Sequence, residues 1–401
     1  KLRNNLLPAI GFIELANAGD FPANLWNQSP LPRYAVILMA FGGTLALSML
    51  PFVVMDAVLS WRNVLCLHDE RICLRQRRRE VEETKDDNLA VAVDCLLGVN
   101  FREQGTEWVD RFGMDTIMGL GAFVVGVGTY MAIGGADPRV HLASDLLTGY
   151  IGNSPCALYG LMNLAWSIFV WLRASKHTRA PQLIPSTDVK KLLENRATEF
   201  KMHSLMSGMT GMVAGCASLL TYTYWQAYVV LAACLVFSVI LNFFWRHRLG
   251  YHRPIFQEGH VMVFYGDDII NALQYTIYWE KQLAAGNTEG THADPLSVLR
   301  PMLASLPDVT TFLRRQNLFD EFCLELCSKY SHDTRLFPDA STVPLTINEI
   351  KLLHLAAESS DVDAIIRDVA KEVIKKAVPT CFKYQQRWLL EVLGCYRAIL
   401  E

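Results

Sequence analysis

Charged residues are scarce in this sequence of 401 residues, and they are unevenly distributed. Asp, Glu, Lys and Arg make up 19% of the chain, against about 25% in an average soluble protein, whereas apolar residues make up 51%. The formal net charge of −3 is too small to indicate a polyanionic partner. No basic recognition helix, zinc-finger spacing or RNA-binding aromatic motif is present, so we predict no nucleic-acid partner.

The sequence also lacks the common signatures of catalysis. It contains no P-loop, no dinucleotide-binding fingerprint, no HExxH or GxSxG motif, no potassium-filter motif and no series of His-rich boxes. Cys323 and Cys327 lie one helical turn apart, but no second pair of ligands follows at metal-binding spacing. The ten cysteines do not form the pattern of a disulfide framework. We therefore predict no metal site, and the sequence assigns no cofactor.

What the sequence does contain is a set of long uncharged runs. A membrane-crossing helix needs roughly 20 mainly apolar residues. Five runs meet this requirement, and they predict spans at about 34–59, 116–136, 151–172, 205–222 and 226–245. Soluble core helices are seldom uncharged for this length, so we predict an all-α, multi-pass membrane helix bundle with the lipid bilayer as its surroundings.

Basic residues alternate between the segments that connect these runs. Nine lie between the first and second runs, only Arg139 between the second and third, seven between the third and fourth, and none between the last two. Under the positive-inside rule, this alternation places the N-terminus outside or in a lumen, and the chain after Trp245 in the cytoplasm. The sequence does not identify which membrane holds the protein.

The predicted spans divide the chain into four parts. Residues 1–33 form an outer N-terminal segment, and residues 34–245 form the transmembrane bundle. Residues 246–294 are a juxtamembrane segment that contains a helix at 261–279, and residues 295–401 are a helical, water-facing cytoplasmic domain. The helix at 261–279 either lies in the membrane interface or crosses the bilayer as a sixth span.

Small residues recur within two of the spans. Ser207, Gly211 and Gly215 follow one another at intervals of four, and the second span repeats the same interval in Ala122–Gly126 and Gly128–Ala132. Helices in lipid associate by close packing of such residues, so we expect these faces to contact neighbouring helices.

Asp56 is the only charge within the first span. An ionisable residue inside a span is a functional candidate, because an unpaired charge in lipid is costly. Pro51 removes a backbone donor and predicts a kink about one turn before Asp56. Because Asp56 lies near the end of its span, its side chain could also simply reach the interface.

A second group of candidates lies in the segment Val261–Trp279, whose only charges are Asp267 and Asp268. In a helix from Gly266, these aspartates and Asn271 share one side, and apolar residues occupy the other. The three side chains could hold magnesium or donate a proton, which makes them candidate catalytic residues. The alternative is structural, because aspartates in a first turn complement the helix dipole.

The spans and two further stretches resemble known proteins. The stretches are NSPCALYGLMN at Asn153–Asn163 and YGDDIIN at Tyr265–Asn271. The membrane half resembles, in general character, the membrane-bound terpene cyclases of fungal secondary metabolism. The resemblance implies acid-initiated cyclisation of a prenylated, lipophilic substrate, and it does not extend to the C-terminal part.

These observations support two main hypotheses of function. In the first, the protein is an enzyme that cyclises or isomerises a lipophilic small molecule by acid catalysis, with Asp267, Asp268, Asn271 and Asp56 as its candidate residues. In the alternative, it is a non-enzymatic scaffold, receptor or subunit whose C-terminal helices bind a protein partner or a second copy of the chain. A channel or transporter is disfavoured, because the spans show no inverted repeat and few internal charges.

Overall fold

The long uncharged runs fold as helices, and several of these helices extend well beyond the runs. The computed structural model describes residues 2–4, 8–26, 31–179, 186–253, 266–286, 299, 305–316, 318–330, 332 and 349–400. Nearly all of these residues are helical. The one strand pairing among them joins β1 (Leu2–Asn4) antiparallel to β2 (Tyr251–Arg253), with Leu2 opposite Arg253. The prediction of an almost entirely helical protein is confirmed.

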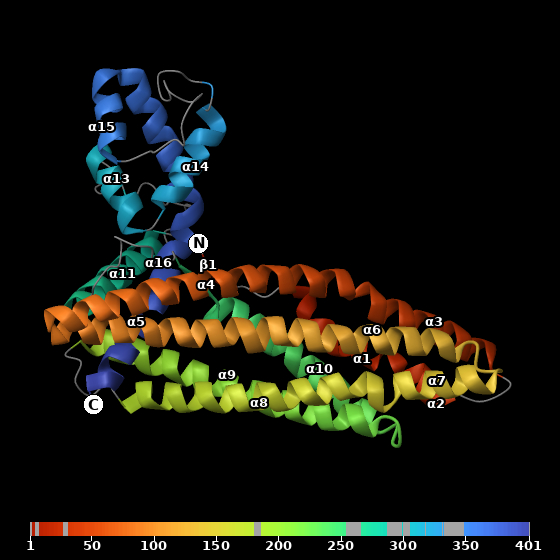
Figure 1. Ribbon diagram of the computed structural model, residues 1–401. Helices are drawn as coiled ribbons and strands as arrows, with labels where there is room; N and C mark the ends of the chain where they lie inside the picture. The colour runs from red at the N-terminus through yellow and green to blue at the C-terminus, as the bar shows by residue number, and fades with distance from the viewer. Residues whose placement is uncertain are drawn as a thin grey trace. The chain divides into compact units, whose positions relative to one another are not determined.

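The chain separates into two units, Lys1–Gly266 with Leu390–Glu401, and Asp267–Leu389. The first unit contains η1 (Pro8–Phe12), α1 (Ile13–Asn17), η2 (Ala18–Asp20), α2 (Phe21–Trp26), α3 (Arg33–Ser48), α4 (Leu50–Thr84), α5 (Asp87–Thr106), η3 (Glu107–Gly113), α6 (Met114–Ala132), α7 (Pro138–Thr148), α8 (Tyr150–Arg179), α9 (Thr187–Leu220), α10 (Ala227–Phe244) and η5 (Trp245–Leu249) (Figure 1).

The second unit is built around its own apolar core. It contains α11 (Gly266–Gly286), α13 (Leu306–Arg315), α14 (Phe319–Tyr330), α15 (Glu349–Glu358) and most of α16 (Ser360–Leu400). Phe312, Phe322 and Phe382 are among the largest buried side chains of this core. The unit boundaries differ from the predicted division at 295, because α11 belongs to the second unit and the end of α16, from Leu390, belongs to the first.

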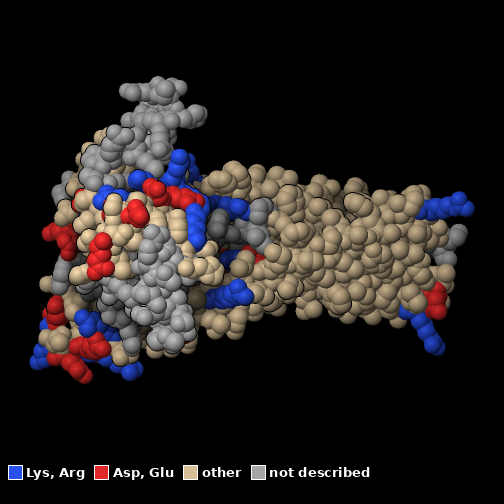
Figure 2. Space-filling view, turned by 90° about the horizontal axis from the view of Figure 1, so that it is seen from above, with Lys and Arg blue, Asp and Glu red and all other residues tan. Residues whose placement is uncertain are grey.

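Four helical stretches of the first unit are long and apolar enough to cross a membrane. They are Arg33–Thr84, Asp87–Ala132, Pro138–His177 and Ala227–Leu249. Figure 2 shows a broad band of surface without Lys, Arg, Asp or Glu, with charged side chains gathered outside it. This band is what a lipid-facing surface requires, so the prediction of a membrane helix bundle is supported at this level. The helix that contains the predicted span 205–222, α9, is not among the four.

The predicted kink in the first span is present. α3 ends at Ser48 and α4 begins at Leu50, with Pro51 in the first turn of α4. A first turn tolerates proline because its missing N–H has no helical partner there. α4 then continues to Thr84 and turns back into α5, so the charged stretch after the span is mostly helical.

The described N-terminal residues contact the long helices. Leu2 is fully buried against Leu67 and Tyr251, at the end of the bundle where β2 lies. Ile13 packs with Val53 and Met118, which belong to two of the apolar stretches. Residues 8–26 form short helical pieces, each too brief to be recognised from sequence as a span. The described residues of this stretch therefore pack between the long helices.

α8 and α9 lie side by side and antiparallel. Asn153 contacts Ser218 at one end of the contact, and Ser167 contacts Gly208 at the other. Between them, a Cβ atom added to Gly215 would lie 2.9 Å from the Cα of Ala157. The expectation that the small-residue stripe of α9 meets another helix is confirmed.

We expect Gly215→Leu to destabilise the bundle, because the neighbour that it would meet is backbone and cannot move aside. The cost of such overpacking is on the order of 1–3 kcal/mol. Thermal unfolding in detergent measures it, with Val213→Leu as the matched control, because Val213 lies on the exposed face of the same helix. Equal stability of the two variants would contradict the contact.

Candidate functional site

Two π-helical segments interrupt the long helices of the first unit. η3 joins α5 to α6, and η5 extends α10. A π-helical turn adds a residue to the helix and redirects its side chains, which is why such turns are frequent at functional sites. η3 directs Asp110 and Arg111, and η5 directs Trp245, toward one internal hollow.

This hollow, which we call the chamber, lies among α6, α8, α9 and α10. Its volume is about 100 Å³, which is smaller than a cavity of about 150 Å³ that binds benzene. The chamber therefore admits a small group or one end of a longer molecule. Its lining mixes apolar residues with polar ones, and the polar ones are Glu14, Thr106, Asp110, Arg111, Tyr159, Asn163, His203, Ser207, Thr210, Ser238, Asn242 and Trp245.

Glu14 is the most unusual of these residues. It lies on α1, in the N-terminal stretch that packs between the long helices. The hydroxyl of Ser238, on α10, donates a hydrogen bond to Oε1 of Glu14 at 2.6 Å. Oε2 is buried and has no hydrogen-bond partner among the described residues. A buried carboxyl oxygen without a partner is costly, so this group is a candidate for contact with a ligand or for proton transfer.

The facing wall comes from α8 and α9. Nδ2 of Asn163 donates to the carbonyl oxygen of Ser207 at 3.0 Å and contacts its hydroxyl at 3.3 Å. The ring of His203 lies 5.0 Å from that of Trp245, centroid to centroid. The side chain of Tyr159 completes this side of the chamber. The wall is thus fixed by interhelical contacts, and it offers hydroxyl, amide and imidazole groups.

Arg111 closes the chamber on another side, and its charge is neutralised there. Its guanidinium donates to Asp56 at 2.6 and 3.1 Å and to Glu107 at 3.2 Å. All three side chains are buried. The structure therefore places Asp56 in a buried ion pair. Asp56 does not line the chamber, and it positions Arg111, which does.

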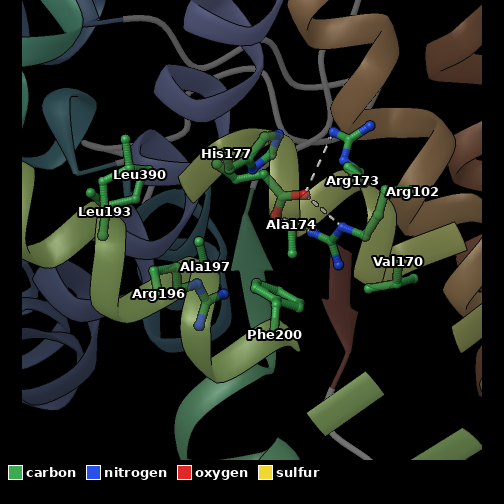
Figure 3. Close-up of a pocket in the computed structure, with 11 residues that line it drawn as sticks. Arg102, Val170, Arg173, Ala174, His177, Leu193, Arg196, Ala197, Phe200 and Leu390 are labelled. Atoms are coloured by element: carbon green, nitrogen blue, oxygen red, sulfur yellow. Dashed lines mark hydrogen bonds and ion pairs between the residues drawn. The ribbon is translucent and has the colours of Figure 1, made fainter. Parts of the chain in front are cut away.

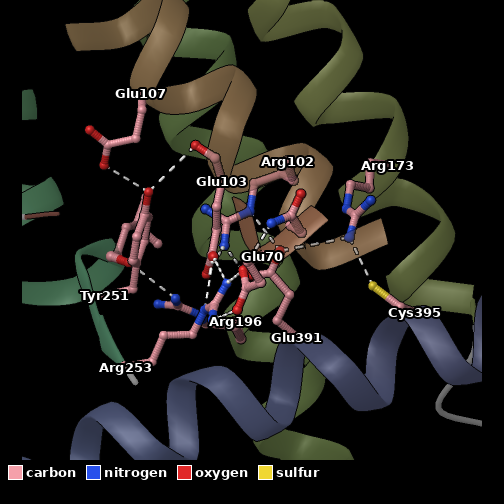
Figure 4. A network of polar contacts seen from close by, with 12 residues as sticks. Glu70, Arg102, Glu103, Glu107, Arg173, Arg196, Tyr251, Arg253, Glu391 and Cys395 are labelled. Carbon is pink, nitrogen blue, oxygen red and sulfur yellow. Dashed lines mark hydrogen bonds and ion pairs between the residues drawn. The ribbon is translucent and has the colours of Figure 1, made fainter. Parts of the chain in front are cut away.

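A network of buried charges continues from Glu107 toward the end of the bundle where β2 lies (Figure 4). The hydroxyl of Tyr251 donates to Glu107 at 2.9 Å. Arg253 pairs with Glu70 at 2.6 Å and with Glu103 at 2.5 Å. These contacts join α4, α5, η3 and β2 through side chains that have little access to water.

The same network reaches the end of α16. Arg102 forms a two-pronged ion pair with Glu391, in which Nε donates to Oε1 at 2.6 Å. Arg173 lies 3.8 Å from Oε1 of the same carboxylate. Burial alone would raise the pKa of Glu391, but the charges of Arg102 and Arg173 lower that pKa below its ordinary value.

The candidates of the DDxxN motif lie elsewhere. Asp267, Asp268 and Asn271 are exposed on the first turns of α11, in the second unit. The helix from Gly266 is confirmed, and so is its apolar face, because Ile269, Leu273 and Ile277 are buried. None of the three candidates lines the chamber. Tyr265 and the earlier residues of the predicted helix lie outside the described residues.

Reasoning from the sequence missed Glu14, Asp110 and His203. Glu14 carried a usable signal, since it is the only charge between Asn4 and Gly19 in an otherwise apolar stretch. Asp110 and His203 lie in charged or polar surroundings in the sequence and gave no such signal. Within the described part of the chain, no group of three or more His, Cys, Asp and Glu side chains could hold a metal ion.

We expect the stabilising effect of Glu391 to depend on pH. Because its pKa is lowered on folding, the ion pair stabilises the protein above the ordinary Glu pKa of about 4.3 and loses this effect as the pH falls through that value and below. At pH 7, Glu391→Gln should lower the unfolding free energy by on the order of 3 kcal/mol.

The gap in stability between the native protein and Glu391→Gln should therefore narrow on acidification. Denaturant titrations of both proteins between neutral and acidic pH measure it. Glu83→Gln, which removes an exposed carboxylate of α4, is the control and should show little change at any pH. A gap that stays constant with pH would refute this role of the carboxylate.

Comparisons with protein-family models, curated proteins and solved structures find no match to this chain. The stretch Asn153–Asn163, one of the two on which the resemblance to membrane-bound terpene cyclases rested, lies on α8, where Asn153 and Asn163 bind α9 and Tyr159 lines the chamber. The resemblance itself gains no support from the comparisons, so the chamber's geometry is the basis for the function proposed below.

Proposed function

We propose that this protein is a multi-pass membrane enzyme that isomerises or cyclises a lipophilic, prenyl-like molecule by proton transfer in the chamber. One observation carries the proposal. Glu14, a carboxyl group with one oxygen that has no hydrogen-bond partner among the described residues, lines a hollow between helices that are long and apolar enough to cross a membrane. A greasy ligand can reach such a site from the bilayer, and the small volume of the chamber suits the reacting end of the ligand rather than the whole molecule.

The bundle in this proposal has five crossings. α9 supplies the fifth crossing in this proposal. It packs antiparallel to α8 along the contact from Asn153 to Ser167, and α8 belongs to one of the stretches that can cross the membrane. The end of the bundle that carries β2 and Glu391 then faces the cytoplasm, because the basic residues gather there. The helical domain built on the second unit would lie on the same side.

The proposed reaction needs one proton donor and one acceptor. A neutral Glu14 would give its proton from Oε2 to a carbon–carbon double bond, leaving a carbocation on the adjacent carbon. The faces of Tyr159 and Trp245 can stabilise that charge. Asp110 would then take a proton from a neighbouring carbon, directly or after ring closure, and a new double bond forms. Product and substrate have the same atoms and electrons, and a water molecule returns the proton from Asp110 to Glu14.

Asp267, Asp268 and Asn271 have no part in this proposal, because their side chains are exposed and do not line the chamber. Asp56 has an indirect part, because its ion pair holds Arg111 at the chamber wall.

Photo-crosslinking tests the binding step. The probe is a geraniol analogue that carries a diazirine, added to the protein in lipid nanodiscs. We expect cross-linked peptides from Ile10–Glu14 and Tyr159–Asn163, and unlabelled geraniol should compete for them. Cross-links confined to lipid-facing residues such as Val229 and Val236 would refute binding in the chamber.

A second measurement separates binding from chemistry. Glu14→Gln keeps the contact with Ser238 but cannot donate an acidic proton, so it should retain cross-linking and lose conversion of prenyl alcohols by 10²-fold or more. Glu83→Gln is again the control. The native protein could be cross-linked specifically and yet convert none of a series of prenyl alcohols and diphosphates. That result would show a receptor or scaffold for such molecules instead of an enzyme.

A further inference from the structure

A second hollow lies between α8, α9 and the end of α16, and three arginines stand among its mainly apolar lining residues (Figure 3). We call it the basic pocket, and its lining includes Arg102, Arg173, Arg196, His177 and Glu391. All of these residues belong to the first unit. Three guanidinium groups thus face one carboxylate among the described residues of the lining.

The hydrogen bonds of these arginines are incomplete in a way that points to an anion. Arg102 is only 2% exposed, yet its Nη1 atom has no hydrogen-bond partner among the described residues. The side chain of Arg173 is 17% exposed, and its Nε atom is buried and also has no hydrogen-bond partner among the described residues. Buried guanidinium donors are normally satisfied, and phosphate and carboxylate oxygens are the acceptors that they match best. Glu391 satisfies part of this demand from inside the protein.

The surroundings indicate where such an anion would come from. Trp171 and Leu172, beside Arg173 on α8, are exposed apolar residues of a membrane-crossing stretch. Lys201 stacks over the Trp171 ring at 5.6 Å. Aromatic and basic residues together mark the headgroup level of a bilayer, and basic pockets between helices at that level bind lipid headgroups.

We propose that the basic pocket binds the phosphate group of an anionic phospholipid, with Arg173 and Arg102 as its principal ligands. The free volume, about 20 Å³, holds roughly one water-sized group, so one phosphoryl oxygen enters while the rest of the headgroup stays at the mouth. Glu391 occupies part of the same site and competes with the phosphate. This inference does not depend on the chemistry of the chamber.

Native mass spectrometry tests the proposal on the full chain released from nanodiscs of phosphatidylcholine that contain a minor fraction of phosphatidic acid. We expect selective retention of phosphatidic acid by the native protein. Arg173→Gln should weaken retention about tenfold or more, because it removes a charge-assisted hydrogen bond. Lys176→Gln makes the same change of charge at an exposed position of α8 and should retain the lipid. Equal loss in both variants, or in neither, overturns the proposal.

Two further arms make the result decisive. Glu391→Gln removes the competing carboxylate, so this variant should bind phosphatidic acid more tightly than the native protein does and should recover thermal stability when the lipid is added. Weaker binding by this variant, if it remains folded, counts against the site. Thermal shifts with inorganic phosphate and glycerol phosphate distinguish the source of the phosphate. If they bind as tightly as phosphatidic acid and through Arg173, the pocket serves a soluble phosphate instead of the lipid.

Discussion

The pairing of charges buried among apolar helices is the constraint on which the rest of this structure depends. A lone charge inside a bilayer costs several kcal/mol, and removing one partner of a buried pair costs about 3–5 kcal/mol. Here several of the buried charges occur as partners. Arg111 holds Asp56, Arg253 holds Glu70, and Arg102 holds Glu391. Each pair joins elements that are distant in sequence, so the network that neutralises the charge also fixes how the helices pack.

Buried polar atoms that lack a partner indicate where a ligand could bind. Among the described residues, Oε2 of Glu14, Nη1 of Arg102, Nε of Arg173 and both carboxyl oxygens of Asp115 are among the buried polar atoms without a hydrogen-bond partner. Glu14 lines the chamber, and the two arginines line the basic pocket. A smaller hollow, lined by Arg102, Asp110 and His203 among others, shares residues with both. The chamber and the basic pocket are therefore neighbours within the first unit, and the proposed anion site and the proposed reaction chamber together would suit a ligand with a charged head and an apolar body.

Small residues also contribute to the packing of the helices around the chamber. Gly42 and Gly19 bring the N-terminal stretch and α3 into backbone contact, and Gly160 does the same for α8 and Gly211 of α9. Without such close approach, the N-terminal stretch could not pack among the long helices, and Glu14 could not reach Ser238. Packing by small side chains and pairing of charges thus act together, since the first brings the backbones close and the second selects the register.

The sequence by itself determined the features that depend on neighbouring residues. Four of the five uncharged runs fall in helical stretches that are long and apolar enough to cross a membrane. Pro51 lies at the break between α3 and α4, and the spacing of apolar residues after Gly266 predicted the buried face of α11. The local sequence is sufficient to predict these features. Solubility in lipid, the missing N–H of proline and helical periodicity each depend on a short stretch of chain.

Only the tertiary structure decided which polar residues meet. Arg102 and Glu391 are 289 residues apart, and no local pattern relates them. The alternation of basic residues predicted an outer N-terminal segment and did not address its packing, whereas the structure packs its short helical pieces between long helices and brings Glu14 to the chamber. The aspartates at Asp267 and Asp268 looked costly in an apolar segment, but their exposure on the first turn of α11 lets water and the helix dipole offset their charge. Whether a charge is buried, paired or solvated depends on contacts that form only when distant parts of the chain come together.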